Sequence, residues 1–130
     1  MNINIKKNFV HIDVTFEEGV SVLDGISGGG KTFLIKSIYE YCLSVGIDVL
    51  YISYENALET DSIKSACRNK KIILFDNADL YMTDELFRYL KGLNDTIVIV
   101  AMKHSFLFDS FDCKSYRVEY KGKDLWIENW

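Results

Sequence analysis

The stretch GISGGGKT, residues Gly25 to Thr32, decides the expected fold. It holds four of the eight glycines, follows the apolar segment 20–23, and precedes a helical apolar pattern that runs to Val45. Glycines let backbone amides turn inward around an anion because no side chain stands in the way. The N-terminus of the following helix adds further amides and the positive end of its dipole. The stretch therefore predicts a phosphate-binding loop between a strand and a helix.

The apolar residues outside this stretch follow strand-like and helix-like spacings in turn. Asp61 and Thr83 are placed to cap helices, and Gly46 and Gly92 are placed to end them. The expected elements are a hairpin over residues 3–16, strands at 20–23, 49–54, 71–75 and 96–102, helices at 30–45, 62–68 and 84–91, and a hairpin over residues 116–127.

Strands that alternate with helices predict an α/β fold whose central strands are parallel and joined by right-handed crossovers. The segments 71–75 and 96–102 are continuously apolar, as expected for strands covered on both faces. The chain has 130 residues, of which 48% are apolar and 26% charged. This length and balance fit one globular domain over residues 1–130.

Composition excludes several classes of partner. Fifteen basic and nineteen acidic residues give a net charge of −4, so no general basic field favours nucleic acid or an anionic membrane. Cys42, Cys67 and Cys113 lack the spacing of metal or disulfide frameworks, which favours reduced thiols. The first ten residues lack the apolar run of a signal peptide, and no window approaches a membrane span. We therefore expect a cytoplasmic protein.

The glycine-rich stretch also satisfies the pattern GxxxxGK[ST], and through it the chain resembles the P-loop NTPases, with residues 25–32 as a Walker A motif. This resemblance implies that Lys31 places a positive charge at the β- and γ-phosphates, and that Thr32 offers a hydroxyl to Mg²⁺. The alternative is a glycine-rich turn followed by a surface lysine. The resemblance assigns to nucleotide binding Gly25, Ser27, Gly28, Gly29, Gly30, Lys31, Thr32 and Phe33.

A second segment, IILFDNAD at residues 72–79, resembles a Walker B motif, in which an apolar strand ends in an acidic residue. The resemblance makes Asp76 the carboxylate on the Mg²⁺ side, usually acting through water, because this hard cation prefers oxygen ligands and keeps part of its hydration shell. Without the Walker A motif, an aspartate at a strand end would be read as a cap or turn residue.

The order of these motifs is similar to that of the ABC and AAA+ branch of ATPases. This resemblance implies a three-layer P-loop NTPase fold with a mainly parallel central sheet, an N-terminal β-hairpin and a C-terminal strand pair. It places the strand at 96–102 between the strands of the two Walker motifs. It also makes Phe9 a candidate for stacking on adenine, and His104, or Ser105 in its place, a candidate γ-phosphate contact. A core position for Phe9 and an exposed loop position for His104 remain alternatives.

The chain departs from that family where hydrolysis is carried out. The family carries glutamate after the Walker B aspartate, whereas this chain has Asn77. An amide can orient a water molecule but cannot accept its proton, so hydrolysis should be slow unless Asp79 or Glu55 reaches the site. The catalytic candidates are therefore Asn77, Asp79 and His104, with a turn cap as the alternative role of Asp79.

The family's larger insertions are also missing. No ABC signature, glutamine loop or helical lid is present, and the three arginines are interpreted as surface charges. The resulting hypothesis is a reduced P-loop protein that binds ATP and Mg²⁺, with ATP favoured because no NKxD-like guanine motif occurs. It would act as a slow ATPase and as a nucleotide-dependent switch for a protein partner or a homo-oligomer. The alternative is a degenerate, non-catalytic P-loop module for protein–protein interaction; a small nucleotide kinase is disfavoured because it would need more arginines.

Overall fold

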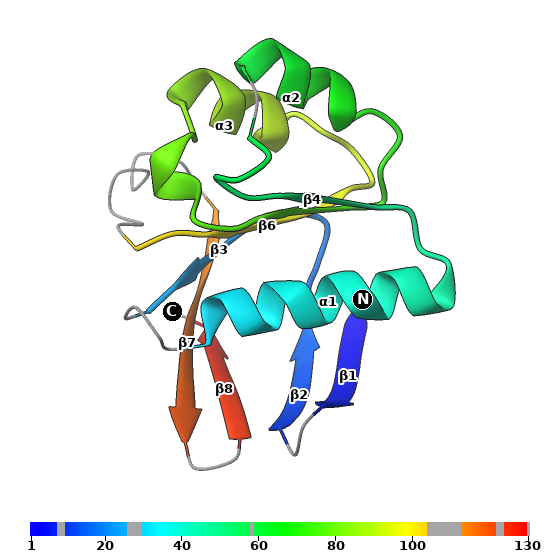
Figure 1. Cartoon of the computed structure of the whole chain (residues 1–130), viewed down its shortest axis with the longest axis vertical. Helices are drawn as coiled ribbons and strands as arrows, with labels where there is room; N and C mark the ends of the chain where they lie inside the picture. Colours follow the sequence, from blue (N-terminus) through cyan, green and yellow to red (C-terminus); the bar gives the residue numbers. More distant parts are fainter. Residues whose placement is uncertain (8–9, 26–29, 58, 104–112, 122–123, 130) are drawn as a thin grey trace.

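The computed structural model of the protein describes residues 1–7, 10–25, 30–57, 59–103, 113–121 and 124–129 (Figure 1). Strands and helices alternate through the centre of the chain, and a hairpin lies at each end. The strands are β1 (Asn2–Lys7), β2 (Val10–Thr15), β3 (Gly19–Asp24), β4 (Val49–Ile52), β5 (Ile72–Phe75), β6 (Ile97–Ala101), β7 (Lys114–Lys121) and β8 (Asp124–Asn129). The helices are α1 (Lys31–Val45), α2 (Thr60–Ala66), the 3₁₀ turn η1 (Ala78–Leu80) and α3 (Asp84–Lys91).

The strands form one mixed sheet in the order β1-β2-β8-β7-β3-β6-β5-β4. From β7 to β4 all neighbours are parallel, whereas β7 and β8 pair antiparallel. The antiparallel β1–β2 hairpin joins this six-stranded part at the register pair His11–Asp124. The expected α/β class is confirmed. The expected position of the strand at 96–102 is also confirmed, because β6 lies between β3 and β5, the strands that lead into the two Walker-like motifs. The strands around the glycine-rich stretch 25–32 therefore all run in the same direction: β3, β5, β6 and β7.

Helices cover both faces of the sheet, with α1 on one side and α2 and α3 on the other (Figure 1). Alternate residues of the central strands supply the two cores: Leu74 and Ile99 pack on the α1 side, and Phe75 and Val100 on the other. Every residue of β5 and β6 is buried. This double burial explains why their sequences are continuously apolar rather than alternating.

The helix ends follow the predicted signals at Gly46, Thr83 and Gly92, the residue after the end of α3, and differ at Asp61. Gly46 ends α1 in the left-handed conformation, and the Thr83 hydroxyl accepts a hydrogen bond from the Leu86 amide at the start of α3. The prediction that Asp61 caps α2 is wrong. That helix begins at Thr60, so Asp61 lies inside its first turn, where a carboxylate interacts favourably with the helix dipole instead.

The strand after α1 is shorter than predicted. Strand β4 ends at Ile52, and the predicted strand residues Ser53 and Tyr54 enter a turn. The side chain of Asn56 holds this turn, because its oxygen accepts from the Ser53 amide at 2.6 Å and its amide donates to the Tyr51 carbonyl at 3.1 Å. The two hydrogen bonds of the Asn56 side chain thus take the place of sheet pairing at Ser53 and Tyr54.

The three cysteines are free; Cys42 and Cys67 are buried and Cys113 is partly exposed. Burial raises the pKa of Cys42 and of Cys67 to about 11. In the part of the chain that the structure describes, no helix is long and apolar enough to cross a membrane.

The raised thiol pKa values predict a loss of stability in alkali. The thiols of Cys42 and Cys67 ionise near pH 9.0 in the unfolded chain and near pH 11 in the folded protein, so rising pH favours unfolding across that interval. Urea unfolding at pH 8 and pH 10.5 should show this decrease. In Cys42→Ala, which lacks one of the two thiols, the decrease should be smaller, and an unchanged decrease would contradict the assignment.

Candidate functional site

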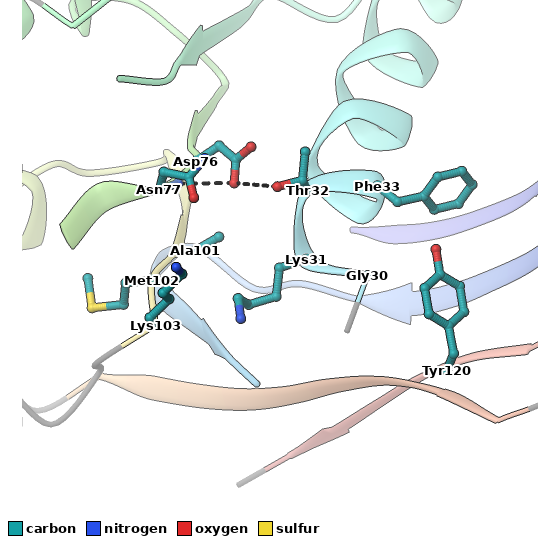
Figure 2. A pocket seen from close by; sticks show the side chains of 10 residues that line it. All are labelled: Gly30, Lys31, Thr32, Phe33, Asp76, Asn77, Ala101, Met102, Lys103 and Tyr120. Carbon is teal, nitrogen blue, oxygen red and sulfur yellow. Dashed lines mark hydrogen bonds between the residues drawn. The ribbon is translucent and has the colours of Figure 1, made fainter. Parts of the chain in front are cut away.

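A cavity of about 250 Å³ opens where the carboxyl ends of β5 and β6 meet the N-terminus of α1 (Figure 2). In parallel α/β sheets, ligands bind at this edge, outside the carboxyl ends of the strands. The residues that line the cavity come from α1, β6, β7 and the segments that follow β5 and β6. They are Gly30, Lys31, Thr32, Phe33, Asp76, Asn77, Ala101, Met102, Lys103 and Tyr120.

Two glycines at the borders of the loop are required by packing. Gly25 has φ +148°, and a Cβ atom there would lie 2.6 Å from the Val118 carbonyl oxygen on β7. Gly30 has φ +102°, and a Cβ atom there would lie 2.5 Å from Leu125 Cδ1 and 3.1 Å from Tyr120 Cε2. The backbone of β7 therefore leaves no room for a methyl group at Gly25, and a methyl group at Gly30 would force the Leu125 and Tyr120 side chains to move. This close approach gives two of the motif's glycines a structural reason that the sequence did not reveal.

The Lys31 side chain extends into the cavity, where its ammonium group donates a hydrogen bond to the Gly25 carbonyl (Figure 2). Partial burial lowers the pKa of Lys31, while the carboxylates of Asp24, Asp79 and Asp76 act in the opposite direction. The nearby charge of Lys103 lowers this pKa further. A partly desolvated ammonium group beside a second lysine forms a positive centre suited to an anion.

Thr32 and Asp76, the two residues that are expected to share a cation, contact each other beside Lys31. The Thr32 hydroxyl donates to Asp76 Oδ1 at 3.2 Å, although the two residues lie 44 positions apart. Asp76 is only 3% exposed. Its amide donates to the Ile52 carbonyl, and its carbonyl accepts from the Tyr81 hydroxyl at 2.7 Å. The backbone of Asp76 is therefore fixed by the last residue of β4 and by Tyr81 after η1, which places its carboxylate at the cavity wall.

The spacing of these two oxygens suits Mg²⁺. Adjacent ligands of an octahedral Mg²⁺ at about 2.1 Å lie about 3.0 Å apart, close to the 3.2 Å between the Thr32 and Asp76 oxygens. Within the described residues, no group of three or more His, Cys, Asp or Glu side chains comes together.

Asn77 lines the cavity in a backbone conformation that few side chains adopt. Its φ of 51° and ψ of 44° are left-handed, and its backbone amide donates to Asp76 Oδ1 at 3.0 Å. Asparagine tolerates this conformation better than most residues, because its short polar side chain bonds locally. The turn after β5 therefore favours asparagine at this position.

Asp79 joins the ends of two strands rather than lining the cavity. Its carboxylate accepts a hydrogen bond from the Lys103 amide at 2.7 Å, which ties the turn η1 to the segment that follows β6. Glu55 is exposed in the turn after β4, and it does not line the cavity either. No acidic side chain other than Asp76 therefore lines the cavity among the described residues.

Several sequence-predicted residues lie outside the described residues: Phe9, Ser27, Gly28, Gly29, His104 and Ser105. The structure brings together Gly30, Lys31, Thr32, Phe33, Asp76 and Asn77, with Gly25 in contact through Lys31. Four cavity residues were missed by the sequence analysis: Ala101, Met102, Lys103 and Tyr120. The first three lie at or just after the carboxyl end of the buried strand β6, a signal that could have found them, whereas the position of Tyr120 depends on how the C-terminal hairpin packs.

The comparisons with known proteins leave the interpretation to this geometry. No protein-family model matches the chain, and a comparison with curated proteins gives no significant match.

Gly30 and Gly19 offer a matched test of the packing role. Both have nearly the same φ, +102° and +99°, but a Cβ atom on Gly19 would meet nothing within 4 Å. We expect Gly30→Ala to destabilise the protein without ligand by about 1–3 kcal/mol more than Gly19→Ala, because only the former crowds the hairpin. Urea unfolding of the two variants measures this difference, and equal losses would show that backbone conformation alone requires Gly30.

Proposed function

We propose that the protein binds a magnesium–nucleoside triphosphate, with ATP as the favoured nucleotide, in the cavity between α1 and the ends of β5 and β6. The observation that carries this proposal is the 3.2 Å contact between the Thr32 hydroxyl and the buried carboxylate of Asp76, beside Lys31. A polyphosphate needs a positive centre, and its cation needs hard oxygen ligands. Both lie within one cavity at the expected edge of the sheet.

Lys31 would supply the main positive charge for the phosphate chain. In the structure its ammonium group donates a hydrogen bond to the Gly25 carbonyl, which is a neutral acceptor. A phosphate oxygen is a stronger acceptor, because a charge-assisted hydrogen bond is about twice as strong as one between neutral groups. Lowering of the Lys31 pKa by burial adds to this preference, since an anion restores the solvation that the ammonium group has lost.

Thr32 and Asp76 would hold Mg²⁺, which would neutralise charge on the terminal phosphates. The remaining residues bear on whether the bound nucleotide is hydrolysed. Asn77 can orient a water molecule through its amide, but it cannot take the proton. Among the described residues, Asp76 is the only acidic side chain that lines the cavity, and its carboxylate is assigned to the cation, while Asp79 is bonded to the Lys103 amide; slow hydrolysis is therefore the activity that we propose for this site.

A role in protein–protein interaction is favoured by two exposed side chains at the same sheet edge. Tyr54 is 55% exposed after β4, and Leu80 is 69% exposed in η1, two elements that lie next to the cavity wall. We propose that these residues contact a protein partner or a second copy of the chain, so that the nucleotide state is read there. The non-catalytic alternative keeps this surface and omits hydrolysis.

The free cysteines support a cytoplasmic location.

Nucleotide binding should stabilise the folded protein. Mg-ATP at about one hundred times its dissociation constant should add about 2.7 kcal/mol and raise the melting temperature by a few degrees. Lys31→Ala should weaken binding about ten- to a hundredfold, because it removes a charge-assisted hydrogen bond. Lys36→Ala is the matched control, since Lys36 is exposed on the same helix. Titration by calorimetry measures both affinities, and no response of the wild type to millimolar Mg-ATP would favour the protein-interaction module.

Asn77→Glu tests the assignment of slow hydrolysis. The substitution restores a general base at the cavity wall and should raise phosphate release about a hundredfold. It should also cost about 1 kcal/mol of stability, because glutamate is strained in the left-handed conformation of residue 77. Asn77→Gly keeps the turn without a base and should give no increase. Wild-type turnover at ordinary ATPase rates would contradict the role assigned to Asn77.

A further inference from the structure

The cavity has two chemically different ends. Asp76, Asn77 and Lys103 lie at one end, and the aromatic rings of Phe33 and Tyr120 lie at the other, with Lys31 and Gly30 between them (Figure 2). Phe33 belongs to the first turn of α1, and Tyr120 to the last residues of β7. Their ring centroids are 6.5 Å apart, with the ring planes inclined by 53°. The two rings form an apolar wall beside a polar anion and cation site.

Tyr120 differs from the residues that share its side of β7. Tyr116 and Val118 are buried in the core under α1, whereas Tyr120 is 42% exposed. A tyrosine that lies beside Gly30 and Phe33, lines the cavity and remains partly exposed is suited to stacking on a planar ligand.

We propose that Tyr120, with Phe33 beside it, is the nucleobase-binding platform of this site. This inference rests on the proposed triphosphate site, because that site fixes the direction of the ligand. A cation held by Thr32 and Asp76 would draw the terminal phosphates toward the end of β5. The α-phosphate and the nucleoside then extend away from Asp76, past Gly30, to the aromatic end of the cavity.

The chemistry of this end points to recognition by stacking. Among the described lining residues, the hydroxyl of Tyr120 is the only side-chain hydrogen-bonding group at the aromatic end. Every base presents a π-face, so stacking tolerates different bases, and purines offer the larger surface. The platform therefore selects purine over pyrimidine nucleotides and distinguishes ATP from GTP only weakly.

Comparison of Mg-ATP with magnesium tripolyphosphate, which has no base, isolates the platform. Calorimetric titration of Tyr120→Ala should show about a tenfold loss of affinity for Mg-ATP and an unchanged affinity for tripolyphosphate. Tyr120→Phe keeps the ring and should retain wild-type affinity for both. Trp126→Ala is the control, because Trp126 is an exposed aromatic residue of the same hairpin that does not line the cavity.

The outcomes separate this inference from the proposed function. Equal losses for both ligands in Tyr120→Ala would mean that Tyr120 supports the loop through Gly30, which overturns the platform and leaves triphosphate binding in place. An unchanged affinity for Mg-ATP would also overturn it, and a loss in Phe9→Ala alone would assign the base to the N-terminal hairpin. If the wild type bound neither ligand, the triphosphate site itself would be wrong and the platform with it.

Discussion

The hydrogen bond from Thr32 to Asp76 is the interaction on which the candidate site depends, because it joins the first turn of α1 to the end of β5. It requires the sheet order in which β6 separates β3 from β5, so that a helix leaving β3 starts beside the end of the more distant strand. The Asp76 backbone is held by two bonds, because its amide donates to the Ile52 carbonyl and its carbonyl accepts from the Tyr81 hydroxyl. The meeting of Thr32 and Asp76 is therefore a consequence of strand order.

Much of the fold could be predicted from local sequence, because the signals for it are local. The glycine cluster, the continuous apolar runs at 72–75 and 97–101, and the cap at Thr83 each act within a few residues. The strand order came from resemblance, since periodicity carries no information about which strands are neighbours. Asp61 and the end of β4 were mispredicted because competing local bonds, such as those of Asn56, decided the boundaries.

The site was predicted less completely, because some of its walls are tertiary. Lys31, Thr32 and Asp76 follow from motif positions, whereas Tyr120 reaches the cavity only because the C-terminal hairpin packs against Gly30. The same packing changes the meaning of the glycines. Their presence cannot be explained by a ligand alone, since Gly25 and Gly30 also accommodate β7 and Leu125.

The approach of β7 to Gly25 also has a consequence for protein engineering. Because the Val118 carbonyl stands where a methyl group on Gly25 would be, β7 limits which residue can occupy position 25. Shortened versions that stop before residue 114 would remove this contact along with Tyr120. Fusion partners or affinity tags should accordingly be attached through a spacer that leaves β8 paired with β7.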